Sequence, residues 1–296
     1  MLNKPHYLEY SSAAVPKISS LKPIIISPDS NQDYSFPNLN ASYITFETNF
    51  TQNMKLSSSN VFYVLKGSGE TIISTSDNQY NDFYPINKTI TWKIGDVFTI
   101  PYVNGNIIHI NKSDHPVLLF NVNDKPLLNF LNCKPTKPRF STTFYDYREI
   151  KNQLEKFNSQ NDSNLRNRNG VLLSNQNMID EKLNTLTHSM WSLINVIKSK
   201  QIQKPHKHNS LAIDLCINMN INDYGKIYTL MGEKIDAHGE IINPVKMNWK
   251  KNWTFTTPPG WWHSHHNEGD NEAWVFPVQD AGLHTYFRTL DIQFIV

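Results

Sequence analysis

The sequence lacks the features of a secreted or membrane-spanning protein. It has two cysteines, Cys133 and Cys216, which are too few for a disulfide scaffold and suit a reducing cytoplasm. The longest apolar runs, such as residues 117–120, fall far short of the ~20 residues that cross a bilayer. The N-terminus has no apolar stretch of the kind that directs secretion. We therefore expect a cytoplasmic protein with no membrane partner.

An excess of charge of one sign is also missing. Lysine and arginine number 28 against 26 aspartates and glutamates, so the formal net charge is only +2, and no basic stripe stands out. This pattern argues against a nucleic-acid partner. Hydrophobic residues make up 39% and aromatic residues 12% of the 296 residues, which indicates a folded soluble protein with one large domain or two small ones.

The pattern along the chain predicts four parts. Residues 1–38 have little periodicity and are interpreted as an arm that packs over the body or pairs with a neighbouring subunit. Residues 39–135 contain many short apolar runs separated by turn residues, which is typical of a sandwich or barrel. Residues 136–188 are polar and predict a partly helical linker, and strands return over residues 189–296.

Three local patterns give more specific expectations. The apolar run 61–65, the turn Gly67-Ser68-Gly69 and the run 71–74 together predict a β-hairpin. Within the linker, residues 145–157 and 178–186 have the spacing of helices. At the end of the chain, the alternation over residues 283–294 predicts a strand.

The two strand-rich regions carry the same motif. The pattern W-K-x4-F-T-x-P begins at Trp92 and again at Trp249, and each tryptophan stands nine residues before its proline, Pro101 or Pro258. A shared motif at one separation indicates an internal repeat. The simplest all-β architecture is therefore a duplicated barrel.

A cluster of histidines lies in the second repeat. His206 and His208 stand two residues apart, so on a strand their side chains point the same way. About fifty residues later, Pro258 to Asn267 reads P-x-G-x-x-H-x-x-x-N, with His263 just after the turn. A third imidazole from a neighbouring strand would complete a facial set around one divalent metal and leave positions open for water or substrate.

These motifs resemble those of the cupins, which are jelly-roll barrels with an H-x-H pair in a first motif and P-x-G-x-x-H-x-x-x-N in a second. The first repeat carries the family's G-x5-P from Gly95 to Pro101. The duplicated arrangement is similar to the gentisate 1,2-dioxygenase-like bicupins. That resemblance implies two cupin barrels and an iron(II) enzyme that opens hydroxylated aromatic acids with molecular oxygen.

The first repeat departs from this pattern. Counting back from Gly67, its H-x-H positions fall on Met54 and Leu56, which cannot replace imidazole at a metal. His109 is interpreted as an ordinary, partly buried histidine or a relic of a site. We therefore expect a degenerate, metal-free first barrel and a metal in the second, the reverse of the usual gentisate enzyme. The acid that cupins often carry after H-x-H is Asp214 here, one step off the usual spacing, so a three-histidine site is favoured.

Two further residues are candidates for catalytic roles. His265 shares strand parity with His263 and either faces the cavity, as a donor beside the ligands or a substrate contact, or serves the core. Arg288 is either a surface charge or an inward guanidinium, which would offer a planar fork to a substrate carboxylate.

Other side chains are candidates for binding the substrate beside Arg288. Trp261 and Trp262 are either core or, beside a metal, a stacking surface for a planar ring. Gln279 and His284 either belong to a turn at residues 280–282 or reach into the cavity. The predicted substrate-binding set is Trp262, Gln279, His284 and Arg288.

The leading hypothesis from these residues is a mononuclear non-haem iron(II) dioxygenase whose partners are a small aromatic acid and O2. Manganese, nickel or zinc could replace iron. The alternatives are a metal-dependent isomerase, lyase or hydrolase, and a non-catalytic small-molecule-binding cupin. The long arm and the exposed sheet edges of two barrels predict a homo-oligomer.

Overall fold

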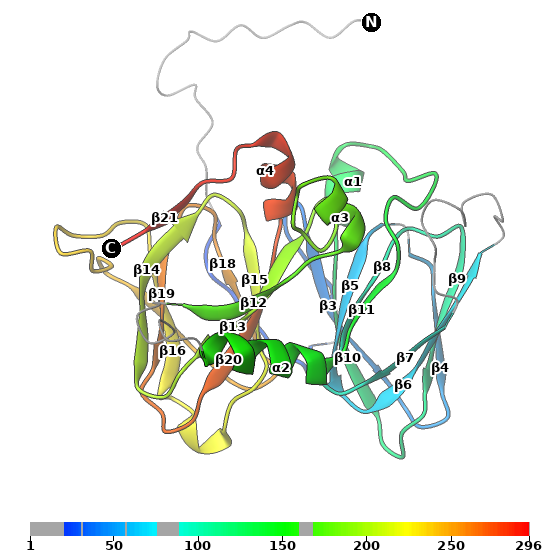
Figure 1. Cartoon of the computed structure of the whole chain (residues 1–296), viewed down its shortest axis with the longest axis horizontal. Coiled ribbons are helices and arrows are strands. Elements are labelled where there is room, and N and C mark those ends of the chain that lie inside the picture. The colour runs from blue at the N-terminus through cyan, green and yellow to red at the C-terminus, as the bar shows by residue number, and fades with distance from the viewer. Residues whose placement is uncertain (1–20, 31, 57, 76–88, 160–167, 296) are drawn as a thin grey trace, which may run out of the picture.

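A computed structural model describes residues 21–30, 32–56, 58–75, 89–159 and 168–295. It contains two halves that lie side by side, each built from two β-sheets, with a few short helices at their borders (Figure 1). This confirms the predicted all-β architecture with a duplicated barrel. In the described part of the chain, no helix is long and apolar enough to cross a membrane.

The N-terminal half pairs a six-stranded sheet with a four-stranded sheet. Their strand orders are β11-β8-β5-β10-β3-β2 and β4-β9-β6-β7. The elements are β2 (Tyr34–Ser35), β3 (Asn40–Phe46), β4 (Thr51–Met54), β5 (Asn60–Lys66), β6 (Ser68–Thr75), β7 (Thr89–Lys93), β8 (Val97–Ile100), β9 (Gly105–Asn111), β10 (Val117–Asn123), α1 (Lys125–Phe130) and β11 (Thr143–Tyr145).

The C-terminal half pairs a six-stranded sheet with a five-stranded sheet. Their strand orders are β1-β18-β15-β20-β13-β12, with β1 at Ile25–Ile26, and β17-β16-β19-β14-β21. The elements are β12 (Asn169–Leu173), α3 (Gln176–Asp180), β13 (Trp191–Ile197), β14 (Gln201–His208), β15 (Ala212–Cys216), η2 (Ile221–Asp223), β16 (Ile227–Gly232), β17 (Val245–Asn248), β18 (Thr254–Thr257), β19 (Trp262–Asn267), β20 (Ala273–Gln279), α4 (Ala281–Phe287) and β21 (Ile292–Phe294).

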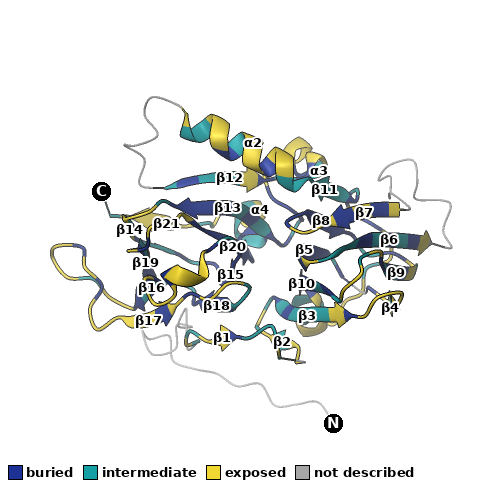
Figure 2. Cartoon of the chain, turned by 90° about the horizontal axis from the view of Figure 1, so that it is seen from below, coloured by how far each residue is buried: buried dark blue, intermediate teal, exposed yellow. Residues whose placement is uncertain are grey.

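The predicted linker and the part of the N-terminal arm that the structure describes contribute strands to the sheets; residues 1–20 of the arm lie outside the described residues. Strand β1 (Ile25–Ile26) pairs with β18 of the C-terminal half, so this part of the arm packs on the body of its own chain. In the linker, β11 extends one barrel and β12 the other. Between them α2 (Tyr147–Asn158) buries Ile150 and Leu154 and leaves its outer face exposed (Figure 2). The predicted homo-oligomer stays a prediction.

A shared hydrophobic core joins the two halves. One cluster of buried side chains contains residues of β5 and β10 from the first half and of β13, β15 and β20 from the second. The rings of Tyr63 and Phe276 meet across this boundary, with centroids 5.3 Å apart. Each barrel also has a core of its own, around Trp92 in the first half and Trp249 in the second. The repeated tryptophans therefore serve equivalent interiors.

Three local predictions differ from the structure. The predicted hairpin at residues 61–74 is wrong, because β5 and β6 belong to different sheets and Gly67, with φ +85°, turns the chain from one to the other. The second linker helix is only the short α3, which ends before Lys182 at φ +61°. The predicted strand 283–294 begins as α4, which buries Ala281 and Gly282 and leaves Tyr286 and Phe287 exposed, so the alternation of apolar residues did not mark a buried strand face.

Candidate metal centre

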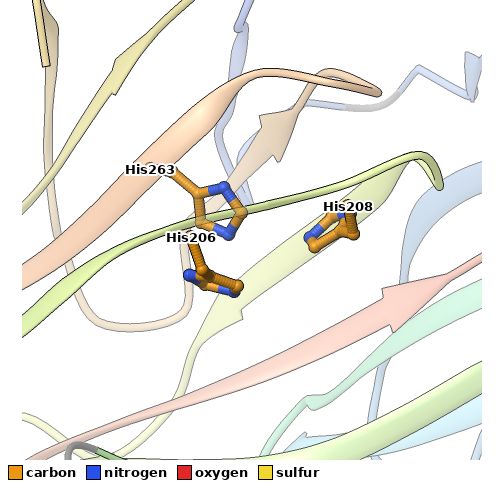
Figure 3. Close-up of side chains that lie close together, drawn as sticks. All are labelled: His206, His208 and His263. Atoms are coloured by element: carbon orange, nitrogen blue, oxygen red, sulfur yellow. The ribbon is translucent and has the colours of Figure 1, made fainter. Parts of the chain in front are cut away.

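Three histidines meet on two adjacent strands of the C-terminal barrel. His206 and His208 come from β14, and His263 lies directly opposite His206 on β19. A register shift between Gln203 and His206 sets this alignment. One nitrogen from each ring can be chosen so that all three lie within 4.8 Å of one another. Figure 3 shows the three rings gathered at one point, as the motif spacing predicted.

Hydrogen bonds leave one nitrogen free on two of these rings. Nδ1 of His208 donates to the carbonyl of Ser210 at 2.8 Å, and Nδ1 of His263 donates to the carbonyl of Trp261 at 3.2 Å. Because a carbonyl only accepts, each Nδ1 carries the proton and each Nε2 keeps its lone pair. Burial lowers the pKa of His208 to about 4 and that of His263 well below its usual value, so both rings are neutral. Neutral imidazoles fixed through the other nitrogen fit a divalent transition metal.

The three histidines face a cavity of about 130 Å³ between the two sheets of the barrel. Its opposite wall comes from β13, β15 and β20, and Arg168, just before β12, and two side chains of β21 line its edge. The apolar lining is Trp191, Leu193, Val275, Pro277, Ile292 and Phe294, and the other polar lining is Arg168, Asn195, Asp214, His265 and Gln279. The site therefore combines nitrogen donors suited to a metal with a largely apolar cavity that opens to solvent beside the exposed side chains of Ile292 and Phe294.

Asp214 places a carboxyl group on the wall of this cavity. It stands on β15, in the other sheet from the histidines, and Thr257 donates a hydrogen bond of 2.6 Å to its Oδ2. Burial raises the pKa of Asp214 to about 7. Asp214 does not belong to the cluster of His206, His208 and His263, as its spacing from the H-x-H pair indicated. Near neutral pH its carboxyl group can hold or release a proton beside a molecule bound in the cavity.

His265 lies inside the barrel beside the cluster. Its Nδ1 is 2.8 Å from the hydroxyl of Thr229, which also accepts a 2.8 Å hydrogen bond from the indole of Trp249. Burial lowers its pKa to about 3, so this ring is also neutral. His265 lines the cavity, where its catalytic role stays a prediction.

The other predicted substrate-binding residues separate into two groups. Gln279 lines the cavity and accepts a hydrogen bond from Ser210, next to His208. Trp262 does not line it, because neighbours on a strand face opposite sides and His263 points inward. Trp262 instead lies under the ammonium group of Lys207, 4.9 Å away. The tryptophan of the cavity is Trp191, which the motif did not reveal.

Arg288 and His284 lie outside the cavity. Arg288 is exposed at the end of α4, with φ +61°, and its guanidinium donates to the carbonyl of Thr285. His284 stands on the same helix, near Asn209 and Thr289. Their predicted inward positions depended on a strand, and a helix turns the two side chains elsewhere. The arginine of the cavity is Arg168, from a segment that sequence reasoning assigned to the linker.

Known structures with the same architecture cover most of this chain. The salicylate 1,2-dioxygenase of Pseudaminobacter salicylatoxidans aligns with a TM-score of 0.65 and 11% identity over 87% of this chain and 75% of its own. A structure of the same enzyme with gentisate bound aligns with a TM-score of 0.65 and 10% identity over 87% of this chain and 72% of its own. The vicilin of Solanum melongena aligns with a TM-score of 0.54 and 11% identity over 88% of this chain and 77% of its own.

The chain has the bicupin fold. A comparison with protein-family models and one with curated protein sequences gave no match. At 11% identity the solved structures establish the architecture alone. Within this fold, the metal-binding chemistry rests on the histidines of the bicupin itself.

The first barrel of the bicupin has apolar side chains at the positions that match the three histidines. Met54 lies opposite Ile107 on β4 and β9, in the place where His206 lies opposite His263 on β14 and β19. Leu56 follows Met54 as His208 follows His206. These side chains, with Phe62 and Phe98, belong to or pack on the core of the first barrel. They offer no imidazole, in agreement with the positions predicted from Gly67.

His109 corresponds to His265 and not to a metal ligand. In the first barrel, Thr71 bonds Nδ1 of His109 at 2.7 Å and accepts a 2.8 Å hydrogen bond from the indole of Trp92. The second barrel repeats this arrangement with Thr229, His265 and Trp249. The two barrels therefore share an internal hydrogen-bonded triad and differ in the side chains at the metal positions. His109 is fully buried, which favours its interpretation as a structural histidine.

We expect Thr71→Val to destabilise the first barrel by about 2–4 kcal/mol. Valine has nearly the same shape as threonine, but it leaves the Trp92 indole and a buried imidazole nitrogen without a partner, at about 1–3 kcal/mol for each buried polar group. Urea unfolding followed by tryptophan fluorescence measures the change. The matched control is Thr91→Val on β7, where the side chain is exposed. Equal stability of the two variants would contradict a structural role for the triad.

Proposed function

We propose that this bicupin is a mononuclear non-haem iron(II) dioxygenase that acts on a small hydroxylated aromatic acid. The observation that carries the proposal is the cluster of His206, His208 and His263 at the wall of a largely apolar cavity. Three neutral imidazoles leave a divalent metal with its full charge and with positions open to other ligands. An iron(II) ion in this place would supply a Lewis acid that holds substrate and oxygen together.

The cavity lining fits an aromatic acid. Trp191 and Phe294 supply aromatic surface for a planar ring, and Arg168 supplies a cation for a carboxylate. Burial lowers the pKa of Arg168 to about 10, which still leaves it charged at neutral pH. The similarity to a salicylate dioxygenase that forms adducts with gentisate supports the same substrate class.

One observation favours a second candidate, a metal-dependent isomerase or lyase that does not consume oxygen. Asp214 faces the cavity with its pKa raised to about 7, as suits a group that transfers protons near neutral pH. The similarity to a vicilin supports the third alternative, a binding protein without turnover. Oxygen consumption separates the first candidate from both others.

The test is to purify the protein without oxygen, load it with iron(II), and follow oxygen uptake with salicylate, gentisate and other hydroxybenzoates. We expect one metal ion per chain, and one O2 consumed for each aromatic acid lost. For variants that remove one of the three histidines, His266→Ala is the matched control. His266 lies on the same strand as His263 but stacks on Tyr228 on the opposite face of the sheet. Loss of an aromatic acid without oxygen uptake would replace the dioxygenase with the second candidate. Metal binding without turnover of any acid would support the binding protein.

A further inference from the structure

Arg168 makes an unusual contact with one of the three histidines. Its Nη2 lies 2.5 Å from Nδ1 of His206 and 2.7 Å from the backbone carbonyl of Lys204. Its guanidinium carbon lies 4.9 Å from the ring centre of Phe294. Its Nε is buried and has no hydrogen-bond partner. The guanidinium is thus held beside the three histidines, and at least one of its N–H donors has no hydrogen-bond acceptor.

This contact fixes the proton of His206 on the wrong nitrogen for a metal ligand. A guanidinium only donates, so Nδ1 of His206 must accept, and the proton of the neutral ring then lies on Nε2. His208 and His263 have the opposite arrangement, with Nδ1 protonated and Nε2 free. Two of the three imidazoles are therefore ready to bind a metal, and the third is occupied by Arg168.

Metal binding through Nε2 of His206 requires its proton to move to Nδ1. An Nδ1–H would then face the N–H groups of Arg168, and two donors do not bond. The guanidinium must leave His206, and the carbonyl of Lys204 satisfies only one of its donors. Among the described residues no carboxylate pairs with Arg168, and the cavity's acid, Asp214, is bonded to Thr257. A partly buried guanidinium without a counter-ion is costly, and an anion in the cavity removes that cost.

We propose that Arg168 couples the two binding events of this cavity: it bonds His206 when no metal is present, and it binds the carboxylate of the ligand when His206 holds the metal. This inference rests on the metal site of the proposed function and requires no particular reaction. It replaces Arg288 by Arg168 as the carboxylate-binding residue. By linkage, the metal and the anion each strengthen the binding of the other.

The first test is nitrogen NMR of the metal-free protein with labelled histidines. Nitrogen shifts distinguish a ring protonated at Nε2 from one protonated at Nδ1. We expect His206 to carry its proton on Nε2 in the wild type and on Nδ1 after addition of zinc(II), while His208 and His263 stay protonated at Nδ1. A metal-free His206 that is already protonated at Nδ1 would overturn the proposal, and no substituted protein is needed.

The second test measures affinities for zinc(II) and for benzoate by calorimetry. In the wild type, we expect zinc(II) to raise the affinity for benzoate at least about tenfold, within the usual range for coupled sites. Arg168→Met keeps a long apolar side chain against Phe294 but removes the donors and the charge. It should bind zinc(II) at least about tenfold more tightly than the wild type and lose most of its affinity for benzoate.

The control is Arg288→Met, which removes an exposed arginine and should change neither affinity. Removing a positive charge by itself favours the binding of a cation, so tighter zinc(II) binding alone does not show that Arg168 acts through His206. The NMR result separates this charge effect from the change in the position of the His206 proton. Equal zinc(II) affinity in the wild type and Arg168→Met would overturn the coupling and leave the proposed function standing. Failure of the wild type to bind zinc(II) would overturn both.

Discussion

Replacing His263 by alanine should remove the metal and the activity together. Two imidazoles and water hold a divalent metal weakly, and His263 is the ligand that joins β19 to the pair on β14. Even changes to groups that only orient ligands cost about 10–100-fold in metal affinity, so loss of a ligand should exceed that range. Metal analysis after dialysis against iron(II) or zinc(II), together with oxygen uptake, measures both effects.

Two histidines of the same strand serve as controls for this variant. His266→Ala should keep the metal and the activity, because His266 stacks on Tyr228 outside the barrel, with ring centres 4.8 Å apart. His265→Ala should keep the metal but lower turnover, because His265 lines the cavity without belonging to the clustered ligands. A His263→Ala protein that retains a full equivalent of metal would refute the three-histidine centre.

Only part of the ligand set could be predicted from local geometry. His206 and His208 share a face by strand alternation, whereas His263, about fifty residues later, was selected because its motif resembles the second cupin motif. The repeated W-K-x4-F-T-x-P motif predicted the duplication, and in the structure Trp92 and Trp249 donate to equivalent threonines.

The opposite wall of the cavity could not be predicted in this way. Trp191 faces the histidines because β13 belongs to the sheet on the far side of the barrel, and Arg168 reaches His206 from the residue before β12. Nothing near either residue in the sequence encodes that position. Arg288 was selected from an apparent strand alternation that equally fits α4. Trp262 was selected for its closeness to His263, although alternation places neighbours on opposite faces.

The two barrels also show how one scaffold can keep or lose a site. Asp214 lies opposite Phe255 on β18, and Phe62 occupies the matching position opposite Phe98 in the first barrel. There Phe62 stacks on Phe98, with ring centres 4.9 Å apart, and packs against His109. In the first barrel, aromatic rings fill the space that corresponds to the cavity of the second barrel. Asp214 lines that cavity.

Asp214→Asn should stabilise the metal-free protein at high pH by up to about 4 kcal/mol. The pKa of Asp214 rises from 3.8 to about 7 on folding, so above pH 7 the native state buries a carboxylate that the unfolded state exposes to water. Three pKa units correspond to about 4 kcal/mol, an upper limit because the surroundings relax. Asparagine accepts the Thr257 hydrogen bond without a charge.

The dependence on pH makes this prediction specific. Below about pH 4 Asp214 is protonated in both states, so the variant and the wild type should be equally stable. Between pH 4 and 7 the unfolded state loses the proton that the native state keeps, so wild-type stability falls relative to the variant as pH rises. Above pH 7 the difference stays constant. Urea unfolding at pH 4, 6 and 8.5 measures all three regimes.

Asp223 provides a control of opposite sign. The side chain of Asn271 and nearby backbone N–H groups hold the pKa of Asp223 below its usual value, so this carboxylate stabilises the native state. Asp223→Asn should therefore destabilise the protein at neutral pH, and its effect should vanish as pH falls through the pKa of the folded state. If Asp214→Asn instead behaves like Asp223→Asn, the carboxylate of Asp214 is stabilised where it lies. It would then be ionised at neutral pH and could not serve as the proton-holding group of the cavity.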